Sequence, residues 1–119
     1  MKKKVAILGS TGSIGKSLLK IINDNKNKFE VVLITANNNY RELLKQARLY
    51  KVKNVIINNE KSYQKFMYLN KNKNLKIYKK FNNLNKILKK KVDYTMSAIT
   101  GIEGLDPTIK ILKLSKKIA

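Results

Sequence analysis

Glycines and hydroxyl residues alternate in a short segment near the amino terminus of this chain. Residues 9–15 read Gly-Ser-Thr-Gly-Ser-Ile-Gly. Glycine allows a tight turn and a close approach of a ligand to the backbone. The hydroxyls of Ser10, Thr11 and Ser13 are suited to cap a helix or to donate to phosphate oxygens. This composition predicts a site for an anion, most often a phosphate or diphosphate.

A strand and a helix must flank this segment for the anion site to form. The apolar run 5–8 predicts a strand that is buried on both faces. Residues 14–22 predict a helix, and its apolar positions share one helical face. These positions are Ile14, Leu18, Ile21 and Ile22. The helix would aim its free N–H groups and positive dipole end at the turn.

Each of the three glycines has its own expected role. Gly9 lets the chain leave the strand, Gly12 leaves room for a ligand, and Gly15 lets the helix pack closely. The spacing is Gly-x-x-Gly-x-x-Gly, which matches the common dinucleotide fingerprint Gly-x-Gly-x-x-Gly only in part. The alternative is a turn that merely joins strand to helix. We favour the phosphate site because strand, triple glycine and helix occur together.

The second predicted strand, residues 29–36, ends in three asparagines. In a nucleotide-binding βαβ unit the adenosine ribose lies here, and NAD sites usually carry a carboxylate at this point. Asn37, Asn38 and Asn39 carry no charge, so an NADP(H) 2′-phosphate is permitted, and Arg41 is a candidate partner for it. The asparagines are also suited to form a turn and to cap the next helix, which is compatible with this interpretation.

The remainder of the chain continues to alternate strands and helices. Tyr40, Leu43, Leu44 and Ala47 share a helical face, and Tyr63, Phe66 and Met67 mark a third helix. Strands are expected at residues 54–57, 75–78 and 92–98, short helices at 84–88 and from Asp106, and a loop with Gly101 and Gly104.

This alternation predicts the α/β class. We expect a Rossmann-like, doubly wound, mainly parallel sheet in one NADP(H)-binding domain over residues 1–119. Residues 9–15, 36–39 and 97–101 follow strand ends, so they should converge on one edge of the sheet.

Composition limits the chemistry of this chain. It has no Cys, no His and only seven carboxylate side chains. We therefore predict no catalytic residue and no metal ligand within it. The apolar run after Met1 is too short for a signal peptide or a membrane span. The sequence predicts a cytoplasmic protein that does not bind membranes.

The net charge of +20 invites a nucleic-acid interpretation. However, Arg41 and Arg48 are the only arginines, and the other 25 basic residues are lysines spread over every segment. Arginine is the preferred bidentate reader of phosphate and guanine. We expect lysine-rich solvated surfaces and no specific nucleic-acid site. A basic nucleotide- or nucleic-acid-binding module without catalysis is the alternative.

Three segments together resemble 1-deoxy-D-xylulose 5-phosphate reductoisomerase. They are residues 7–15, the strand 29–36 with its asparagines, and residues 98–108, which read Ala-Ile-Thr-Gly-Ile-Glu-Gly-Leu-Asp-Pro-Thr. The resemblance covers the family's amino-terminal NADPH-binding domain. It implies an oxidoreductase of non-mevalonate isoprenoid biosynthesis. This enzyme rearranges 1-deoxy-D-xylulose 5-phosphate and reduces the product with NADPH to 2-C-methyl-D-erythritol 4-phosphate.

The resemblance also implies which residues bind the cofactor. They are Thr11, Gly12, Ser13, Ile14, Asn37, Asn38 and Asn39. The loop 97–99 would lie on the nicotinamide side. The family usually has Gly and then Lys or Arg where this chain has Asn37 and Asn38. Without this Lys or Arg, binding of the 2′-phosphate would be weaker unless Arg41 or a nearby lysine supplies the positive charge.

The family's remaining parts are not expected in this chain. The resemblance implies a homodimer and a later catalytic domain that holds Mn2+ or Mg2+ and the sugar-phosphate substrate. Residues 116–119 look like the start of a further strand, which predicts a fragment that is inactive alone. A decayed gene product that no longer folds stably is another alternative.

Overall fold

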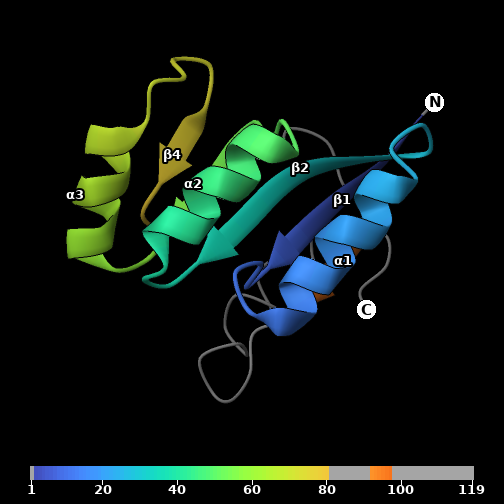
Figure 1. Ribbon diagram of the computed structural model, residues 1–119, viewed down its shortest axis with the longest axis horizontal. Helices are drawn as coiled ribbons and strands as arrows, with labels where there is room; N and C mark the ends of the chain where they lie inside the picture. The colour runs from blue at the N-terminus through green and yellow to red at the C-terminus, as the bar shows by residue number, and fades with distance from the viewer. Residues whose placement is uncertain (1, 81–91, 98–119) are drawn as a thin grey trace.

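Five parallel strands and three helices make up the described part of the chain, residues 2–80 and 92–97 of a computed structural model (Figure 1). The elements are β1 (Lys3–Leu8), α1 (Ser13–Asp24), β2 (Phe29–Ala36), α2 (Tyr40–Leu49), β3 (Asn54–Ile57), α3 (Glu60–Leu69), β4 (Lys76–Tyr78) and β5 (Tyr94–Ser97).

The strand order is β4-β3-β2-β1-β5, and every neighbouring pair is parallel. The chain moves outward from β1 to β4, and β5 then pairs with the other side of β1. The order therefore reverses between β1 and β5, which is the point where ligands bind in open α/β sheets. This confirms the predicted Rossmann-like parallel sheet. The arrowheads of β1 and β2 point to one edge, where α1 begins (Figure 1).

Both faces of β1 are buried, as its apolar run predicts. Val5 and Ile7 belong to the core that includes the inner sides of α1 and α2, and both are fully buried. Ala6 and Leu8 point to the opposite face and are also fully buried. A strand with two covered faces lies in the interior of an α/β domain.

The inner face of α1 differs from the prediction. Gly15, Leu19 and Ile22 are buried, whereas Ile14 and Ile21 are each 59% exposed. The reason is the contact of Gly15 with the turn after β1, since the backbone of Ser10 lies directly against it. This contact fixes the rotation of the helix, and residues one position earlier then point about 100° away.

Asparagine side chains cap the amino ends of α2 and α3. The Asn39 side chain accepts a hydrogen bond from Glu42 N (3.3 Å), and the Asn59 side chain accepts one from Ser62 N (3.0 Å). Each bond satisfies one of the free N–H groups in the first helical turn. In α2 the expected residues Leu43, Leu44 and Ala47 are buried. The third predicted helix is confirmed as α3, in which Phe66 is buried, Tyr63 is half-buried and Met67 is 49% exposed.

The predicted strands agree closely with the observed ones. The strand 54–57 is confirmed as β3, and the segments 75–78 and 92–98 contain β4 and β5. The predicted helices at 84–88 and from Asp106, the loop of Gly101 and Gly104, and residues 116–119 lie outside the described residues. The extent of the domain over residues 1–119 therefore stays a prediction.

An ion pair joins α3 to the residues after β4. Lys79 Nζ lies 2.6 Å from Glu60 Oε2, and Gln64 donates a hydrogen bond to Glu60 Oε1 (3.1 Å). The hydrogen bonds from Lys79 and then Gln64 lower the pKa of Glu60 below its ordinary value. This stabilisation is present above the pKa of the unfolded state and is lost as pH falls through the folded pKa.

We predict that Glu60→Gln lowers stability at neutral pH and that the difference from the parent chain disappears in acid. The reason is that a protonated Glu60 no longer gains from the Lys79 ammonium. Urea unfolding at a series of pH values measures this difference. A difference of constant size from pH 7 to pH 3 would contradict the assignment.

Candidate functional site

The turn after β1 is fixed by a single residue of β2. Gly9 has a φ of 72°, a left-handed conformation that favours glycine. The Gly9 amide donates to Thr35 Oγ1 (2.9 Å), and the Ser10 amide donates to Thr35 O (2.9 Å). The direction in which the chain leaves β1 is therefore set by the end of β2.

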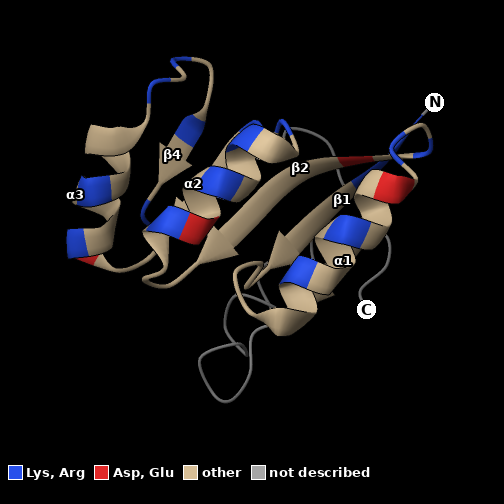
Figure 2. Cartoon of the chain, viewed as in Figure 1, with Lys and Arg blue, Asp and Glu red and all other residues tan. Residues whose placement is uncertain are grey.

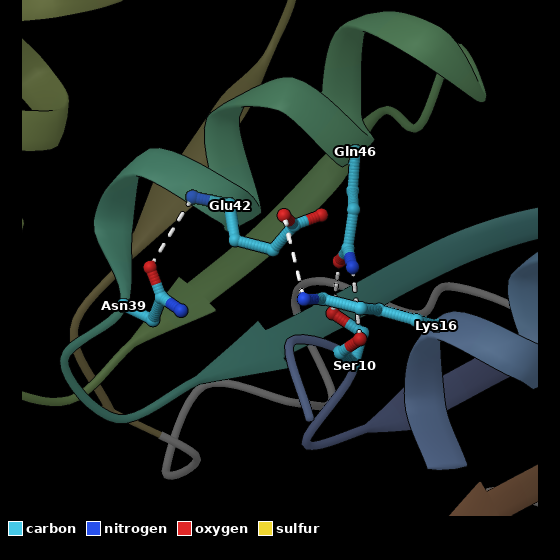
Figure 3. Close-up of polar contacts among 5 residues, drawn as sticks. All are labelled: Ser10, Lys16, Asn39, Glu42 and Gln46. Atoms are coloured by element: carbon cyan, nitrogen blue, oxygen red, sulfur yellow. Dashed lines mark hydrogen bonds and ion pairs between the residues drawn. The ribbon is translucent and has the colours of Figure 1, made fainter. Parts of the chain in front are cut away.

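The Ser10 side chain and carbonyl are held by α2. Ser10 Oγ donates to Gln46 Oε1 (2.7 Å), and Gln46 Nε2 donates back to Ser10 O (2.9 Å), as Figure 3 shows. Ser10 is fully buried and Gln46 is 2% exposed. The prediction that the Ser10 hydroxyl is available to a phosphate is therefore wrong, because this hydroxyl is committed to the interior.

The first turn of α1 is left open. Gly12 is the residue before the helix, and the first helical hydrogen bond runs from Lys16 N to Gly12 O (2.9 Å). The amides of Ser13, Ile14 and Gly15 have no helical acceptor, and no side-chain cap is found for this end among the residues that the structure describes. The expectation that a hydroxyl caps the helix is therefore wrong. The uncapped N–H groups and the helix dipole are suited to an anion.

Gly12 and Gly15 have opposite surroundings. A Cβ atom at Gly12 would meet no atom of the described residues within 4 Å, whereas one at Gly15 would lie 2.5 Å from the Ser10 backbone. The helix thus packs directly on the turn at Gly15, and open space lies over Gly12. This open space lies beside the free amides, at the place where the sequence predicts a diphosphate.

The four predicted residues of this segment lie on one accessible surface. Gly12, Ser13 and Ile14 are exposed, and Thr11 is half-buried. Like several other large apolar side chains of this chain, Ile14 is exposed (59%). It lies beside the open amides, where the apolar part of a ligand would cover it.

The three asparagines form the adjacent loop, at the end of β2. Asn37 O accepts from Asn59 N (2.8 Å), and Asn38 O accepts from Ser62 Oγ (2.9 Å). Asn39 caps α2, so the capping interpretation holds for this residue. The side chains of Asn37 and Asn38 are exposed and point to no partner within the described residues. The loop is thus anchored through its backbone, while two amide side chains remain available.

Two cations surround the first residue of α2. The Arg41 guanidinium lies 5.7 Å and Lys65 Nζ 5.6 Å from the centre of the Tyr40 ring. Arg41 Nε also donates to the Tyr40 hydroxyl (3.3 Å). This hydrogen bond is the main cause of a lowered pKa for Tyr40 and a raised pKa for Arg41. The structure thus places two positive charges beside the asparagine loop.

A second contact joins α1 to α2 close to the turn. Lys16 Nζ lies 3.9 Å from Glu42 Oε1 (Figure 3). The Lys16 side chain is 55% exposed, so this pair contributes about 1 kcal/mol or less to stability. It keeps a lysine on the first helical turn, beside the open amides.

The third predicted segment is described only in part. Ser97 ends β5 and pairs in register with Leu8, so it flanks the turn on the side away from β2. Ile99 and Gly101 lie outside the described residues. Within the described ranges, no group of three or more His, Cys, Asp or Glu is placed to hold a metal ion. No helix there is long and apolar enough to cross a membrane.

Positive charge is spread over the surface and does not form one stripe. Figure 2 shows lysine and arginine on α1, α2, α3 and the connecting turns. A hollow of about 540 Å³ lies at the opposite end of the sheet, where β1 and β2 begin. It is lined in part by Lys2, Lys26, Lys51 and Lys53. The carboxyl ends of α1 and α2 lie there, and their free carbonyls disfavour an anion. These lysines place positive charge beside the partial negative charge at the carboxyl ends of the two helices.

Thr35 and Gln46 support the site, but the analysis of the sequence missed both. Each is a polar residue at an otherwise apolar, buried position: Thr35 near the end of β2, and Gln46 between the core residues Leu44 and Ala47. Such a residue must find a hydrogen-bond partner in the interior. This rule would have marked both, although it would not have named Ser10 as the partner.

The fold and the open helix end define a Rossmann-like α/β domain with an anion-receptive edge. A family model described as 1-deoxy-D-xylulose 5-phosphate reductoisomerase matches residues 5–119. The chain belongs to this family. A reductoisomerase of Pelagibacter ubique is 50% identical over 98% of this chain, and one of Phocaeicola vulgatus is 38% identical over all of it.

Solved structures of reductoisomerases are also similar to this chain. The reductoisomerase from Zymomonas mobilis in complex with NADPH superposes with a TM-score of 0.88 at 28% identity, over 100% of this chain and 31% of its own. A reductoisomerase in complex with magnesium has a TM-score of 0.83 at 26% identity, over 99% of this chain and 30% of its own. The chain spans about a third of the length of the curated relatives it matches.

We predict that the two glycine positions respond oppositely to alanine. Gly15→Ala forces a methyl group against the Ser10 backbone and should cost roughly 1–3 kcal/mol of stability. Gly12→Ala meets open space and should change stability by about 1 kcal/mol or less. Thermal unfolding of the two variants measures this contrast, and equal losses would show that the turn is packed differently.

Proposed function

We propose that this chain binds NADPH as the cofactor-binding part of a 1-deoxy-D-xylulose 5-phosphate reductoisomerase. The observation that carries the proposal is the uncapped end of α1, where Gly12 faces open space at the carboxyl edge of the sheet. Thr11, Gly12, Ser13 and Ile14 would contact the diphosphate side of the cofactor. The solved relative whose structure contains NADPH supports this assignment.

Asn37, Asn38 and Asn39 would hold the adenosine side. None of them carries the cation that the 2′-phosphate of NADPH requires. The charged groups of Arg41 and Lys65 lie 5.7 Å and 5.6 Å from the centre of the Tyr40 ring, beside this loop, and they would supply that charge. We propose that this pair replaces the basic residue that the family usually has within the loop. A carboxylate, which would favour NADH, is absent from residues 37–39.

The activity of the whole enzyme is part of the same proposal. It would rearrange 1-deoxy-D-xylulose 5-phosphate and reduce the product to 2-C-methyl-D-erythritol 4-phosphate as a cytoplasmic homodimer. NADPH supplies the hydride, and the residues of this chain bind and orient the cofactor. The described residues do not fit Mn2+ or Mg2+, since no cluster of three ligands exists among them. No step of the reaction is therefore assigned to a metal on these residues.

We predict that NADPH stabilises the folded chain more than NADH does. At a ligand concentration 100 times Kd, the gain from mass action is about 2.7 kcal/mol. Arg41→Gln should weaken NADPH binding and leave NADH binding unchanged, because only NADPH carries the 2′-phosphate. Lys20→Gln on the outer side of α1 is the matched control for loss of one charge. Equal effects of Arg41→Gln on both cofactors would contradict the 2′-phosphate assignment.

We also predict that any binding to oligonucleotides is nonspecific. A surface with a net charge of +20 attracts polyanions at low salt, and the affinity should fall linearly on a log–log plot against salt. Fluorescence anisotropy with two unrelated oligonucleotides measures this slope. Sequence-selective binding that persists at about 0.2 M salt, close to physiological ionic strength, would favour the nucleic-acid module instead.

A further inference from the structure

We infer that Gln46 of α2 is a positioning residue that holds the turn in the shape that receives the diphosphate of the cofactor. This inference rests on the proposed NADPH site. Gln46 itself is buried and is not placed to touch the ligand. It acts through Ser10, the residue just before the exposed Thr11 and Gly12.

Three elements converge on Ser10. Thr35 of β2 accepts a hydrogen bond from the Ser10 amide, and Gly15 of α1 packs on the Ser10 backbone. Gln46 of α2 forms hydrogen bonds with both the hydroxyl and the carbonyl of Ser10. The contact at Gly15 is a packing contact, and Thr35 O accepts hydrogen bonds from the Ser10 amide (2.9 Å) and from the Ser10 hydroxyl (3.4 Å), so neither residue binds the Ser10 carbonyl. Gln46 is thus the side chain that fixes the Ser10 carbonyl, and with it the orientation of the next peptide group.

The same helix also carries the adenosine side of the proposed site. α2 begins directly after Asn37 and Asn38, and Asn39 is its capping residue. The Lys16–Glu42 pair gives a second connection from α2 to the first turn of α1 (Figure 3). The distance between the two halves of the site is therefore set by α2, and Gln46 is its buried connection to the turn.

A purely structural role does not require this amide. The position lies among Leu43, Leu44 and Ala47, where an apolar side chain of similar size would bury well. Removing the amide leaves the Ser10 carbonyl without its side-chain partner and frees the turn to sample other shapes. Binding must then order the turn again, and that cost weakens affinity.

Gln46→Met tests the inference, since methionine has nearly the same length and no hydrogen-bonding amide. Binding of NADPH and of NADH to the 119-residue chain is measured by titration below the unfolding temperature. We expect both dissociation constants to rise by the same factor, roughly threefold to tenfold. The equal factor distinguishes the diphosphate turn, which both cofactors share, from the 2′-phosphate contact, which Arg41→Gln removes for NADPH alone.

Ile56→Val is the matched control. It removes one methylene from a fully buried residue of β3 and should cost about 0.5–1.5 kcal/mol of stability without altering either dissociation constant. If Gln46→Met lowers stability but leaves both constants unchanged, the positioning role is wrong and the proposed function stands. If the parent chain itself does not bind NADPH, the proposed function is wrong, and the positioning role of Gln46 is wrong with it.

Ser10→Ala keeps the test valid if Gln46→Met does not fold. It removes the Ser10 hydroxyl and retains the bond from Gln46 Nε2 to the Ser10 carbonyl. Both dissociation constants should then rise by about twofold, less than for Gln46→Met. Unchanged constants in a folded Ser10→Ala variant, with Gln46→Met unable to fold, overturn the inference.

Discussion

The backbone of Ser10 is held from three sides, and the candidate site depends on this constraint. The Ser10 amide donates a hydrogen bond to β2, and α1 packs against Ser10 at Gly15. The side-chain amide of Gln46 in α2 donates a hydrogen bond to the Ser10 carbonyl. With Ser10 fixed, the chain has little freedom at Thr11 and Gly12 before α1 begins. The open amides of α1 therefore face a defined direction, toward the edge where the strand order reverses between β1 and β5. A turn joined only to its own strand and helix would not have this rigidity.

The relative strengths of the interactions explain why the buried hydrogen bonds, and not the exposed ion pairs, decide the geometry of the turn. A buried hydrogen bond contributes about 1 kcal/mol, and leaving one buried partner unsatisfied costs about 1–3 kcal/mol. The exposed Lys16–Glu42 pair is worth about 1 kcal/mol or less and weakens with salt. The charges of Arg41 and Lys65 are likewise exposed, so they do not shape the turn, and under the proposed function they would select between the two cofactors. The general excess of lysine has no single location and adds a diffuse positive field.

Much of the fold was predictable because short apolar runs, glycines and asparagine caps are local signals. The strand 54–57 and the buried positions of α2 follow directly from them. The rotation of α1 was not predictable from its apolar pattern, because Ile14 is exposed in the first turn of the helix while Gly15 packs against the Ser10 backbone. The partners of Ser10 could not be predicted either. Thr35 and Gln46 are 25 and 36 residues away, and only the folded sheet brings them to one point.

The most direct test of this account is an NMR titration of the isotope-labelled chain with NADPH. The amide signals of Gly12, Ser13 and Ile14 should shift most, because their N–H groups gain an anionic acceptor. The Ser10 amide and the side-chain amide of Gln46 should shift little, because they are already bonded within the protein. The account is contradicted if Ser13 and Ile14 do not respond at saturating NADPH, or if the largest shifts occur around Lys51 at the other edge of the sheet.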